Sequence, residues 1–411
     1  MRHAPTAAPA RRRRLVAALL VLPLVAAACS SSDSDGGSGA TKATTTTTTA
    51  PTRSTPPAEP IVFNGQGNNL DAYATTPKAD GTFPTQRVWE TVATNPAHGR
   101  DINAQICFLP RTKDGEQWYI AGEDTGQTHP NRPAGWGIFR LEGNEVGSLK
   151  TVQIGKLVPT YQPTDDGPEN YGCGRLPDGR ILTTDVGNQA GGDGNGQLII
   201  WFPPLTGGTY RHFDTVRYCK LDVTLPTAQS ILVRGSDVYV AASRGGVFKY
   251  TGPFPTSDDA AGGCGKKDPT GAPMADTVHK ETFIASGPHG LATPAGLANA
   301  PDDGFYVSSV FTGVIDEFGP DGSFRRTILE PPAGESLGEQ TYSTGTPLGL
   351  GVDRNGTLYY ADIGVIVTKD SAGPGDKTGS LRRIRFVDGK PQPPETMATP
   401  LDFPDGIGIF E

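Results

Sequence analysis

The chain has 411 residues, with 36 lysines and arginines against 44 aspartates and glutamates, and a formal net charge of −8. An acidic chain of this kind argues against nucleic acid as a partner, because phosphates attract basic surfaces. The 54 glycines and 37 prolines indicate many turns, and the length is large for one hydrophobic core, so a repeat architecture is favoured.

The first 28 residues are typical of a bacterial export signal. Arg11–Arg14 is followed by an apolar run, Leu15–Ala28, that is too short to span a bilayer as a mature helix. The run closes with Leu24-Val25-Ala26-Ala27-Ala28-Cys29, which resembles a lipobox. The resemblance implies a signal peptide at 1–28 and acylation at Cys29, with palmitate or a similar chain, so that the protein is extracytoplasmic and lipid-anchored to the bacterial cell membrane. The alternative is an ordinary signal peptide of a secreted protein with an incidental cysteine; twin-arginine export is a further alternative for the route.

Residues 29–60 are predicted to form a disordered tether. They are rich in Ser, Asp, Gly, Thr and Pro, contain Thr44–Thr49 as an unbroken threonine run, and have no aromatic residue. Threonine with proline could carry O-linked sugar, and a plain spacer is the alternative. The remainder, residues 61–411, has no apolar run long enough to span a membrane and is predicted to be one folded domain.

A repeat of strand, tight turn and strand runs through this domain. Gly172–Asp185 and Gly349–Asp362 have the same pattern, in which Asp-Gly or Asn-Gly supplies the hairpin turn. Looser copies are Ile106–Asp124, Ile231–Ala242 and Leu297–Ser309, and a half-copy is Pro404–Phe410. The equivalent first-strand positions, separated by 66, 58, 66, 53 and 57 residues, are Cys107, Cys173, Ile231, Leu297, Leu350 and Ile407.

This near-constant period predicts an all-β fold, a six-bladed β-propeller. The last copy stops after its first strand, so Ile61–Thr76 and Arg87–Val92 should complete the last blade and join the two ends of the domain. Trp136 and Trp201 are expected to pack between blades. The alternative is a β-sandwich or two smaller β-domains.

Four cysteines other than Cys29 are present, and an even number outside the cytoplasm indicates two disulfide bonds. Three pairings are possible. The repeat favours Cys107–Cys173 and Cys219–Cys264, because each pair then lies in neighbouring repeats. No cysteine–histidine spacing indicates zinc.

Two motifs recur at the strand ends. A Pro-x-Gly motif opens three first strands at Pro294, Pro347 and Pro404, and Asp-x-Gly closes strands at Asp124, Asp185 and Asp362. Over most of residues 100–411 these motifs resemble the six-bladed superfamily of NHL-repeat proteins and SMP-30/gluconolactonase-like enzymes. In the lactonase-like members, a Glu, Asn and Asp set holds a divalent ion that polarises an ester carbonyl, and an Asp acts as general base.

In a propeller, the loops into the first strands and the loops between second and third strands meet at the mouth of the central channel, where function resides. The candidates from the first kind of loop are Asp101, Asn103, Glu169, Asn170, His289 and Asp405. Those from the second kind are Glu123, Asp124, Asp185, Asn188, Ser308, Ser309 and Asp362. Their carboxylate and amide oxygens suit Ca²⁺ or another divalent cation. For the Asp-x-Gly residues, capping of their own turns is the alternative.

The resemblance implies that Asp405 is the catalytic residue and that Glu169, Asn170 and Asp405 are metal ligands. The chain departs from the family at Ala295 and Leu348, where the family often has Asn, and neither side chain can bind a metal. Gly334-Glu335-Ser336-Leu337-Gly338 fits the nucleophile-elbow pattern of serine hydrolases, but prolines on both sides place it in a loop, so Ser336 is not expected to be a nucleophile.

Two functions therefore compete at the sequence level. The first is a metal-dependent hydrolase of a lactone or ester; the second is a non-catalytic cell-surface module that binds a saccharide, peptide or protein partner. A lyase or dehydrogenase on the same fold is a third possibility, although no nucleotide or flavin motif is present. We expect a monomer with a small-molecule or glycan ligand, no nucleic acid partner, and contact with the membrane through its lipid alone.

Overall fold

A computed structural model describes residues 55–90, 102, 104–122, 135–157, 170–186, 195–202, 216–269, 271–331, 345–367, 372–374 and 377–411. The predicted signal peptide, Cys29 and the predicted tether as far as residue 54 lie outside the described residues. In the described ranges, no helix has the length and apolar character needed to cross a membrane.

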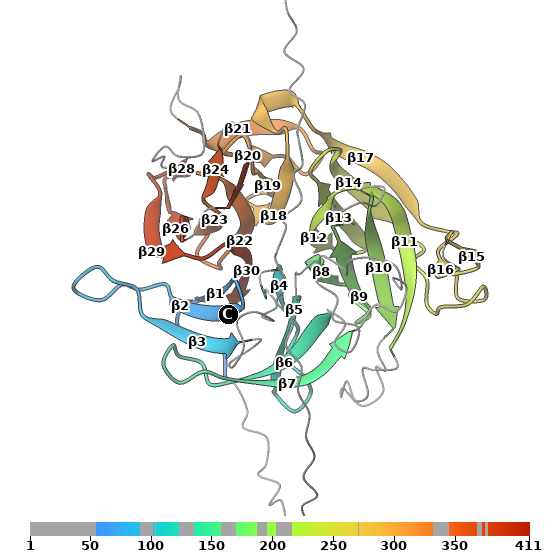
Figure 1. Cartoon of the computed structure of the whole chain (residues 1–411), viewed down its shortest axis with the longest axis horizontal. Coiled ribbons are helices and arrows are strands. Elements are labelled where there is room, and N and C mark those ends of the chain that lie inside the picture. Colours follow the sequence, from blue (N-terminus) through green and yellow to red (C-terminus); the bar gives the residue numbers. More distant parts are fainter. Residues whose placement is uncertain are drawn as a thin grey trace, which may run out of the picture. The chain divides into compact units, whose positions relative to one another are not determined.

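The described chain forms six blades, each built on four antiparallel strands, around a central axis (Figure 1). This confirms the predicted six-bladed β-propeller. From the axis outwards, blade 1 consists of β4 (Ile106–Phe108), β5 (Gln117–Gly122), β6 (Trp136–Glu142) and β7 (Lys150–Leu157). Blade 2 consists of β8 (Asn170–Arg175), β9 (Ile181–Asp185), β10 (Asn195–Phe202) and β11 (Arg217–Pro226). Blade 3 consists of β12 (Ala228–Arg234), β13 (Asp237–Ala242), β14 (Gly246–Thr251) and β17 (His279–Ala285).

Blades 4 to 6 follow the same order. Blade 4 consists of β18 (Pro294–Ala300), β19 (Gly304–Ser309), β20 (Val314–Phe318) and β21 (Phe324–Leu329). Blade 5 consists of β22 (Pro347–Val352), β23 (Leu358–Asp362), β26 (Gly379–Ile384) and β29 (Glu395–Leu401). Blade 6 consists of β30 (Pro404–Phe410), β1 (Ile61–Gln66), β2 (Asn69–Ala74) and β3 (Thr85–Glu90). Short additional strands are β15 (Lys266–Lys267), β16 (Pro273–Met274), β24 (Val365–Val367), β25 (Ala372–Pro374), β27 (Phe386–Val387) and β28 (Lys390–Pro391).

The apolar core is divided among the seams between blades. Because side chains alternate along a strand, each blade presents one apolar face to the blade before it and one to the blade after it. In the described residues, each of the six seams holds its own buried cluster. Trp136 and Trp201 both lie fully buried in the seam between blades 1 and 2, as expected.

Blade 6 is completed by the two ends of the domain, as the truncated last repeat predicted. β30 pairs with β1 in antiparallel register, with Phe410 opposite Ile61 and Ile407 opposite Asn64. β2 and β3 extend this sheet outwards, so that the first and last strands of the domain lie side by side in Figure 1. The β30 edge is thereby covered by backbone pairing.

The innermost strands approach one another so closely that glycine is required where they begin. A Cβ on Gly349 would overlap the carbonyl oxygen of Asp405 in the next blade, and a Cβ on Gly406 would overlap that of Ala104. The same contacts correct one repeat position. Gly408 faces Ile106 as Gly351 faces Ile407, so Ile106, and not Cys107, is the first-blade equivalent of Ile407. The first hairpin has a longer turn, which hides this shift in the sequence.

The disulfide Cys107–Cys173 joins the innermost strands of blades 1 and 2, which confirms the favoured pairing. Three of the other seams place a glycine against an isoleucine at this point: Gly174 against Ile231, Gly351 against Ile407, and Gly408 against Ile106. The cross-link therefore replaces an apolar contact at a position that every blade uses for packing.

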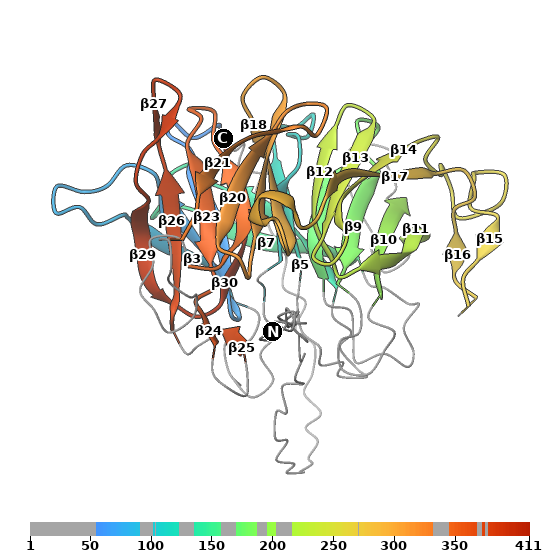
Figure 2. The same ribbon diagram turned by 90° about the horizontal axis from the view of Figure 1, so that it is seen from above.

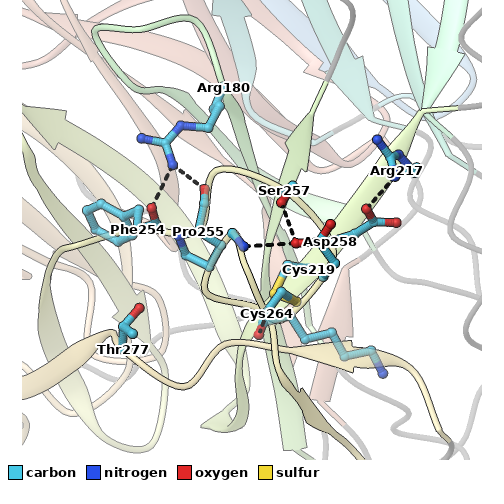
Figure 3. Close-up of a disulfide and its surroundings, with 12 residues drawn as sticks. Arg180, Arg217, Cys219, Phe254, Pro255, Ser257, Asp258, Cys264 and Thr277 are labelled. Atoms are coloured by element: carbon cyan, nitrogen blue, oxygen red, sulfur yellow. Dashed lines mark hydrogen bonds and ion pairs between the residues drawn. A yellow bond between two sulfur atoms is a disulfide. The ribbon is translucent and has the colours of Figure 1, made fainter.

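The second favoured pair, Cys219–Cys264, is also confirmed, and it pins an insertion to a neighbouring blade (Figure 3). The insertion connects β14 to β17 of blade 3, yet its strand β16 pairs in parallel with β11, the outer strand of blade 2. Lys220 and Asp268 form a buried ion pair at 2.5 Å beside this junction. The outer edge of blade 2 is thus covered by chain from blade 3, a feature that the repeat did not predict.

The two faces of the propeller differ in their connections. The mouth face carries the loops into the first strands and the connections between second and third strands, among them β24 and β25. The hairpin face carries the turns between first and second strands and the end of β30. Figure 2 shows β24 and β25 at one face and the C-terminus at the other. At the hairpin face, Arg354 donates to the carbonyl oxygen of Ala58 at 2.5 Å, so the described chain reaches β1 from that side.

Candidate functional site

Six residues begin the innermost strands at equivalent positions and form a ring at the mouth face. The glycine contacts define these equivalences, because each strand-opening glycine meets the backbone of the next ring residue. The ring residues are Ala104, Tyr171, Gln229, Ala295, Leu348 and Asp405. None has more than 8% of its surface exposed.

A β-bulge turns these residues towards the channel axis. The pairing register shifts just before the repeat position in blade 2 (Asn170/Cys173), and the same irregularity recurs in blades 3 to 6. Such bulges re-aim side chains next to functional sites. As a result Tyr171, Ala295 and Leu348, which come from three different blades, pack in one buried cluster. Further apolar residues in this cluster are Val186, Val310, Ile363 and Val365.

Asp405 is the one carboxylate of this ring. It is 2% exposed, and burial raises its pKa well above the ordinary value, while a hydrogen bond from Tyr171 opposes the shift. Its Oδ1 atom has no hydrogen-bond partner within the described chain. Behind it, Asn64 of β1 donates from Nδ2 to the carbonyl oxygen of Gly406 at 2.9 Å, and the Oδ1 atom of this asparagine is also buried without a partner among the described residues. A carboxyl group with a raised pKa at this position can give up a proton in its neutral form and accept one in its ionised form.

Asn170 and Asp185 lie together at the start of blade 2. They are opposite each other in the β8–β9 pair, and each is 1% exposed. Next to them, the hydroxyl of Thr184 accepts from the Gly172 amide at 2.6 Å and donates to the Gln229 carbonyl oxygen at 2.7 Å. The pair is thus brought close to the ring positions of blades 2 and 3.

Asp362 and the two serines have structural roles. The Oδ1 atom of Asp362 accepts from the amides of Thr346 at 2.9 Å and Gly364 at 3.0 Å, which is the turn-capping alternative. Ser309 accepts from the Thr293 amide at 2.9 Å in the equivalent place of blade 4. Ser308 links the Gly296 amide to the Leu348 carbonyl oxygen, both at 2.8 Å, as Thr184 does in blade 2.

His289 lies away from the ring. It belongs to the short 3-10 helix Pro288–Gly290, has a positive φ of 57°, and is exposed. Its imidazole stacks on Phe324, with ring centres 3.7 Å apart and planes 2° apart. Because Phe324 is in β21, the outermost strand of blade 4, the side chain covers the outside of the blade.

The remaining sequence candidates, Asp101, Asn103, Glu123, Asp124, Glu169 and Asn188, lie outside the described residues, as does Ser336. Among those described, no group of three or more His, Cys, Asp and Glu residues could hold a metal ion. The described ring offers oxygens from Asp405, Tyr171 and Gln229, which is fewer than the six to eight that Ca²⁺ takes. The described ring by itself does not fit this ion.

Tyr171 and Gln229 are ring residues that the sequence did not single out. Both take the place of x in Pro-x-Gly, but their strands lack the proline, and in blade 3 Ser230 replaces the glycine. Extending the repeat alignment two residues before Cys173 and Ile231 would have found them.

No protein-family model matches this chain, and no curated protein matches it. Solved structures similar to it include a chain of a nidogen–laminin complex, with 12% identity and a TM-score of 0.47 over 86% of this chain and 98% of the other. Luciferin-regenerating enzyme has 13% identity and a TM-score of 0.45 over 80% of this chain and 96% of the enzyme. Virginiamycin B lyase from Staphylococcus aureus has 13% identity and a TM-score of 0.37 over 84% of this chain and 88% of the lyase. Similarity at this level transfers neither a site nor an activity.

Proposed function

We propose that the mouth of the channel is an active site in which Asp405 provides acid–base catalysis for hydrolysis of a small, largely apolar ester or lactone. The observation that supports this best is a carboxyl group buried at the channel axis with a raised pKa and an Oδ1 atom that has no hydrogen-bond partner among the described residues. Perturbed carboxyl groups in such positions are typical of catalytic sites. The apolar cluster around Tyr171 and Leu348 would contact the body of the substrate.

The proposed reaction needs one proton transfer in each direction. Ionised Asp405 takes a proton from water while the water oxygen bonds to the ester carbonyl carbon. The bond from that carbon to the leaving oxygen then breaks, and the carboxyl group returns the proton to the leaving alkoxide. The products are a carboxylic acid and an alcohol. Because burial raises the pKa of Asp405, the ionised form requires higher pH, and the rate should increase with pH until the carboxyl group is ionised.

The divalent ion expected from the sequence stays a prediction. It would polarise the ester carbonyl, and Glu169, Asn170 and Asp405 would hold it. Metal analysis of the purified protein, with its melting temperature before and after chelation, tests this separately. A stoichiometric ion whose removal lowers the melting temperature supports the proposal; an absent ion with no shift contradicts the metal and leaves Asp405 as the base.

The decisive experiment compares Asp405→Asn with Asp321→Asn on a panel of lactones and aryl esters. Asp321 is exposed in the turn of blade 4 and provides a matched loss of one carboxylate. We expect Asp405→Asn to lower kcat by roughly 100-fold or more with its melting temperature kept, since general catalysis contributes about 10² to 10⁴. Equal activity of the two variants would contradict a catalytic role for Asp405.

A binding module is the second candidate, and Ala295 and Leu348 favour it. Both side chains are apolar and buried, so that, with Ala104, half of the six described ring residues have no group that takes part in chemistry. If no ester or lactone is turned over, glycan and peptide arrays probe this function, and Leu348→Asp is expected to abolish the binding found. An unchanged affinity in that variant would place the ligand elsewhere.

The attachment of the protein to the membrane is also part of the proposal. The two disulfides are typical of proteins outside the cytoplasm, and we propose that Cys29 carries the lipid that holds the protein at the membrane. Mass spectrometry of the N-terminal peptide from the membrane fraction should show an acylated Cys29. A Cys29→Ser variant that stays in that fraction would contradict the anchor.

A further inference from the structure

A cavity of about 310 Å³ lies in the channel on the hairpin side of the disulfide Cys107–Cys173. Apart from Gln105, its lining residues lie at or past the repeat position of blades 1 to 3, whereas the proposed active site precedes that position. Its volume is at the small end of the range for ligand pockets. Its lining residues are Gln105, Cys107, Phe108, Pro110, Cys173, Gly174, Arg175, Ile231 and Val233.

Covalent and hydrogen bonds hold the lining of the cavity in place, on one side through the disulfide and at the mouth-facing end through Gln105. The disulfide holds β4 to β8. The side-chain amide of Gln105 reaches two neighbouring blades: its Oε1 accepts from the Cys173 amide at 3.2 Å and the Ile231 amide at 3.1 Å, and its Nε2 donates to the Ile231 carbonyl oxygen at 3.1 Å. These bonds satisfy strand-edge groups that face the channel and keep Gln105 in place. The shape of the cavity therefore does not depend on a ligand.

Arg175 gives the cavity its charge. It is the charged residue among the lining residues, and no described residue forms a hydrogen bond or ion pair with its guanidinium. The positive charge of Arg175 helps to lower the pKa of Asp178, but the carboxylate of Asp178 accepts a hydrogen bond from Nε of Arg180 at 2.8 Å. At the positions equivalent to Arg175, the other blades have Phe108, Val233, Asn299, Val352 and Ile409. In a chain with a net charge of −8, this guanidinium shares the cavity with one further polar side chain, Gln105, and with apolar side chains such as Phe108 and Val233.

We propose that this cavity is a second binding site, separate from the mouth, for a small monocarboxylate with an aromatic or aliphatic body. The carboxylate would pair with the planar fork of Arg175, which matches its geometry. The body would lie against Phe108, Pro110 and Val233. The described lining has no acidic side chain to repel it, and its size excludes a folded partner.

Isothermal titration calorimetry of the purified protein with phenylacetate tests the site, with phenylacetamide as the neutral analogue. Phenylacetate should bind saturably, the amide at least about tenfold more weakly, and Arg175→Gln should weaken phenylacetate binding by a similar factor, a tenfold change corresponding to about 1.4 kcal/mol. Arg175→Lys keeps the charge without the fork and should lie between the two.

Two controls separate this site from the rest of the molecule. Arg385→Gln removes an exposed arginine from blade 5 and should leave phenylacetate binding unchanged. Asp405→Asn should also leave it unchanged, whatever becomes of hydrolysis at the mouth. The proposal is overturned if no saturable binding occurs at millimolar phenylacetate, if the amide binds equally well, if folded Arg175→Gln binds like the wild type, or if Asp405→Asn abolishes binding.

Discussion

At the scale of single residues, the fold uses the same side-chain type in opposite ways. Asp362 accepts hydrogen bonds from the amides of Thr346 and Gly364, whereas Asp405 has an oxygen at the channel axis that no described residue bonds. Both belong to short motifs that end in glycine, so the local sequence does not distinguish them. The difference arises from the bulge in the innermost strand and from the blades that surround it, which is long-range information. The sequence could therefore predict candidates for the mouth but not which of the described ones would have an oxygen without a partner in the described chain.

Asp316 shows how burial alone can make stability depend on pH. It lies in β20, fully buried, and burial raises its pKa to about 6; Thr327 and His289 oppose the shift, and Glu330 adds to it. The folded state thus holds a proton that the unfolded chain, with a pKa of about 3.9, releases. This contribution to stability is complete below about pH 4 and is lost as pH rises through about 6.

Asp316→Asn should remove this pH dependence, because Asn resembles the protonated carboxyl group. We expect little change near pH 4 and stabilisation by about 3 kcal/mol near pH 8, measured by urea unfolding across that range. Asp321→Asn, in the exposed turn of the same blade, is the control. A stability difference between wild type and Asp316→Asn that stays constant from pH 4 to pH 8 would show that the carboxyl group is not protonated in the fold.

At the scale of strands and blades, the repeat was the informative part of the sequence. Alternating strands and Asp-Gly turns predicted the blades, the closure by β1 and both disulfides, because these follow from local patterns repeated at a regular spacing. The register of blade 1 was misplaced by one residue, since its hairpin is longer. The insertion that joins β16 to β11 could not be predicted, because a two-residue strand leaves no periodic signal and its partner lies in another blade.

The disulfide Cys107–Cys173 should contribute to stability in two separable ways. As a cross-link over 66 residues it is worth about 4 kcal/mol in the chain-entropy model. As part of the seam it also occupies the place that glycine and isoleucine fill elsewhere. We expect the double variant Cys107→Gly, Cys173→Ile to lose the cross-link and keep much of the packing.

The double variant Cys107→Ser, Cys173→Ser should be less stable than the Gly and Ile pair, because it also buries hydroxyl groups, at a cost of about 1 to 3 kcal/mol. Denaturant unfolding of both variants and of the wild type measures the two contributions. If the Gly and Ile pair is no more stable than the serine pair, this position does not belong to the common packing scheme.

At the scale of the whole molecule, the propeller depends on a closure made by the two ends of its domain. Within the described chain, β30 is the single strand of blade 6 supplied by the C-terminus, and β1, β2 and β3 supply the rest. Removal of these three strands would expose one edge of β30 and two apolar seams, those against blades 1 and 5. It would also remove the Asn64 hydrogen bond behind Asp405. Closure and the proposed active site are therefore coupled.

A pair of truncations tests this coupling. A chain that begins at Thr55 keeps every contact described above and should melt in one cooperative transition at nearly the temperature of the longer chain. A chain that begins after Glu90 should lack that transition, and addition of a peptide spanning residues 55–90 should restore it together with activity or binding at the mouth. The subtler variant Asn64→Ala keeps all strands but removes the bond to Gly406, so it should disturb the mouth more than the melting temperature. If the chain lacking β1 to β3 folds cooperatively without the peptide, five complete blades and β30 suffice, and the closure positions the site without being needed for the fold.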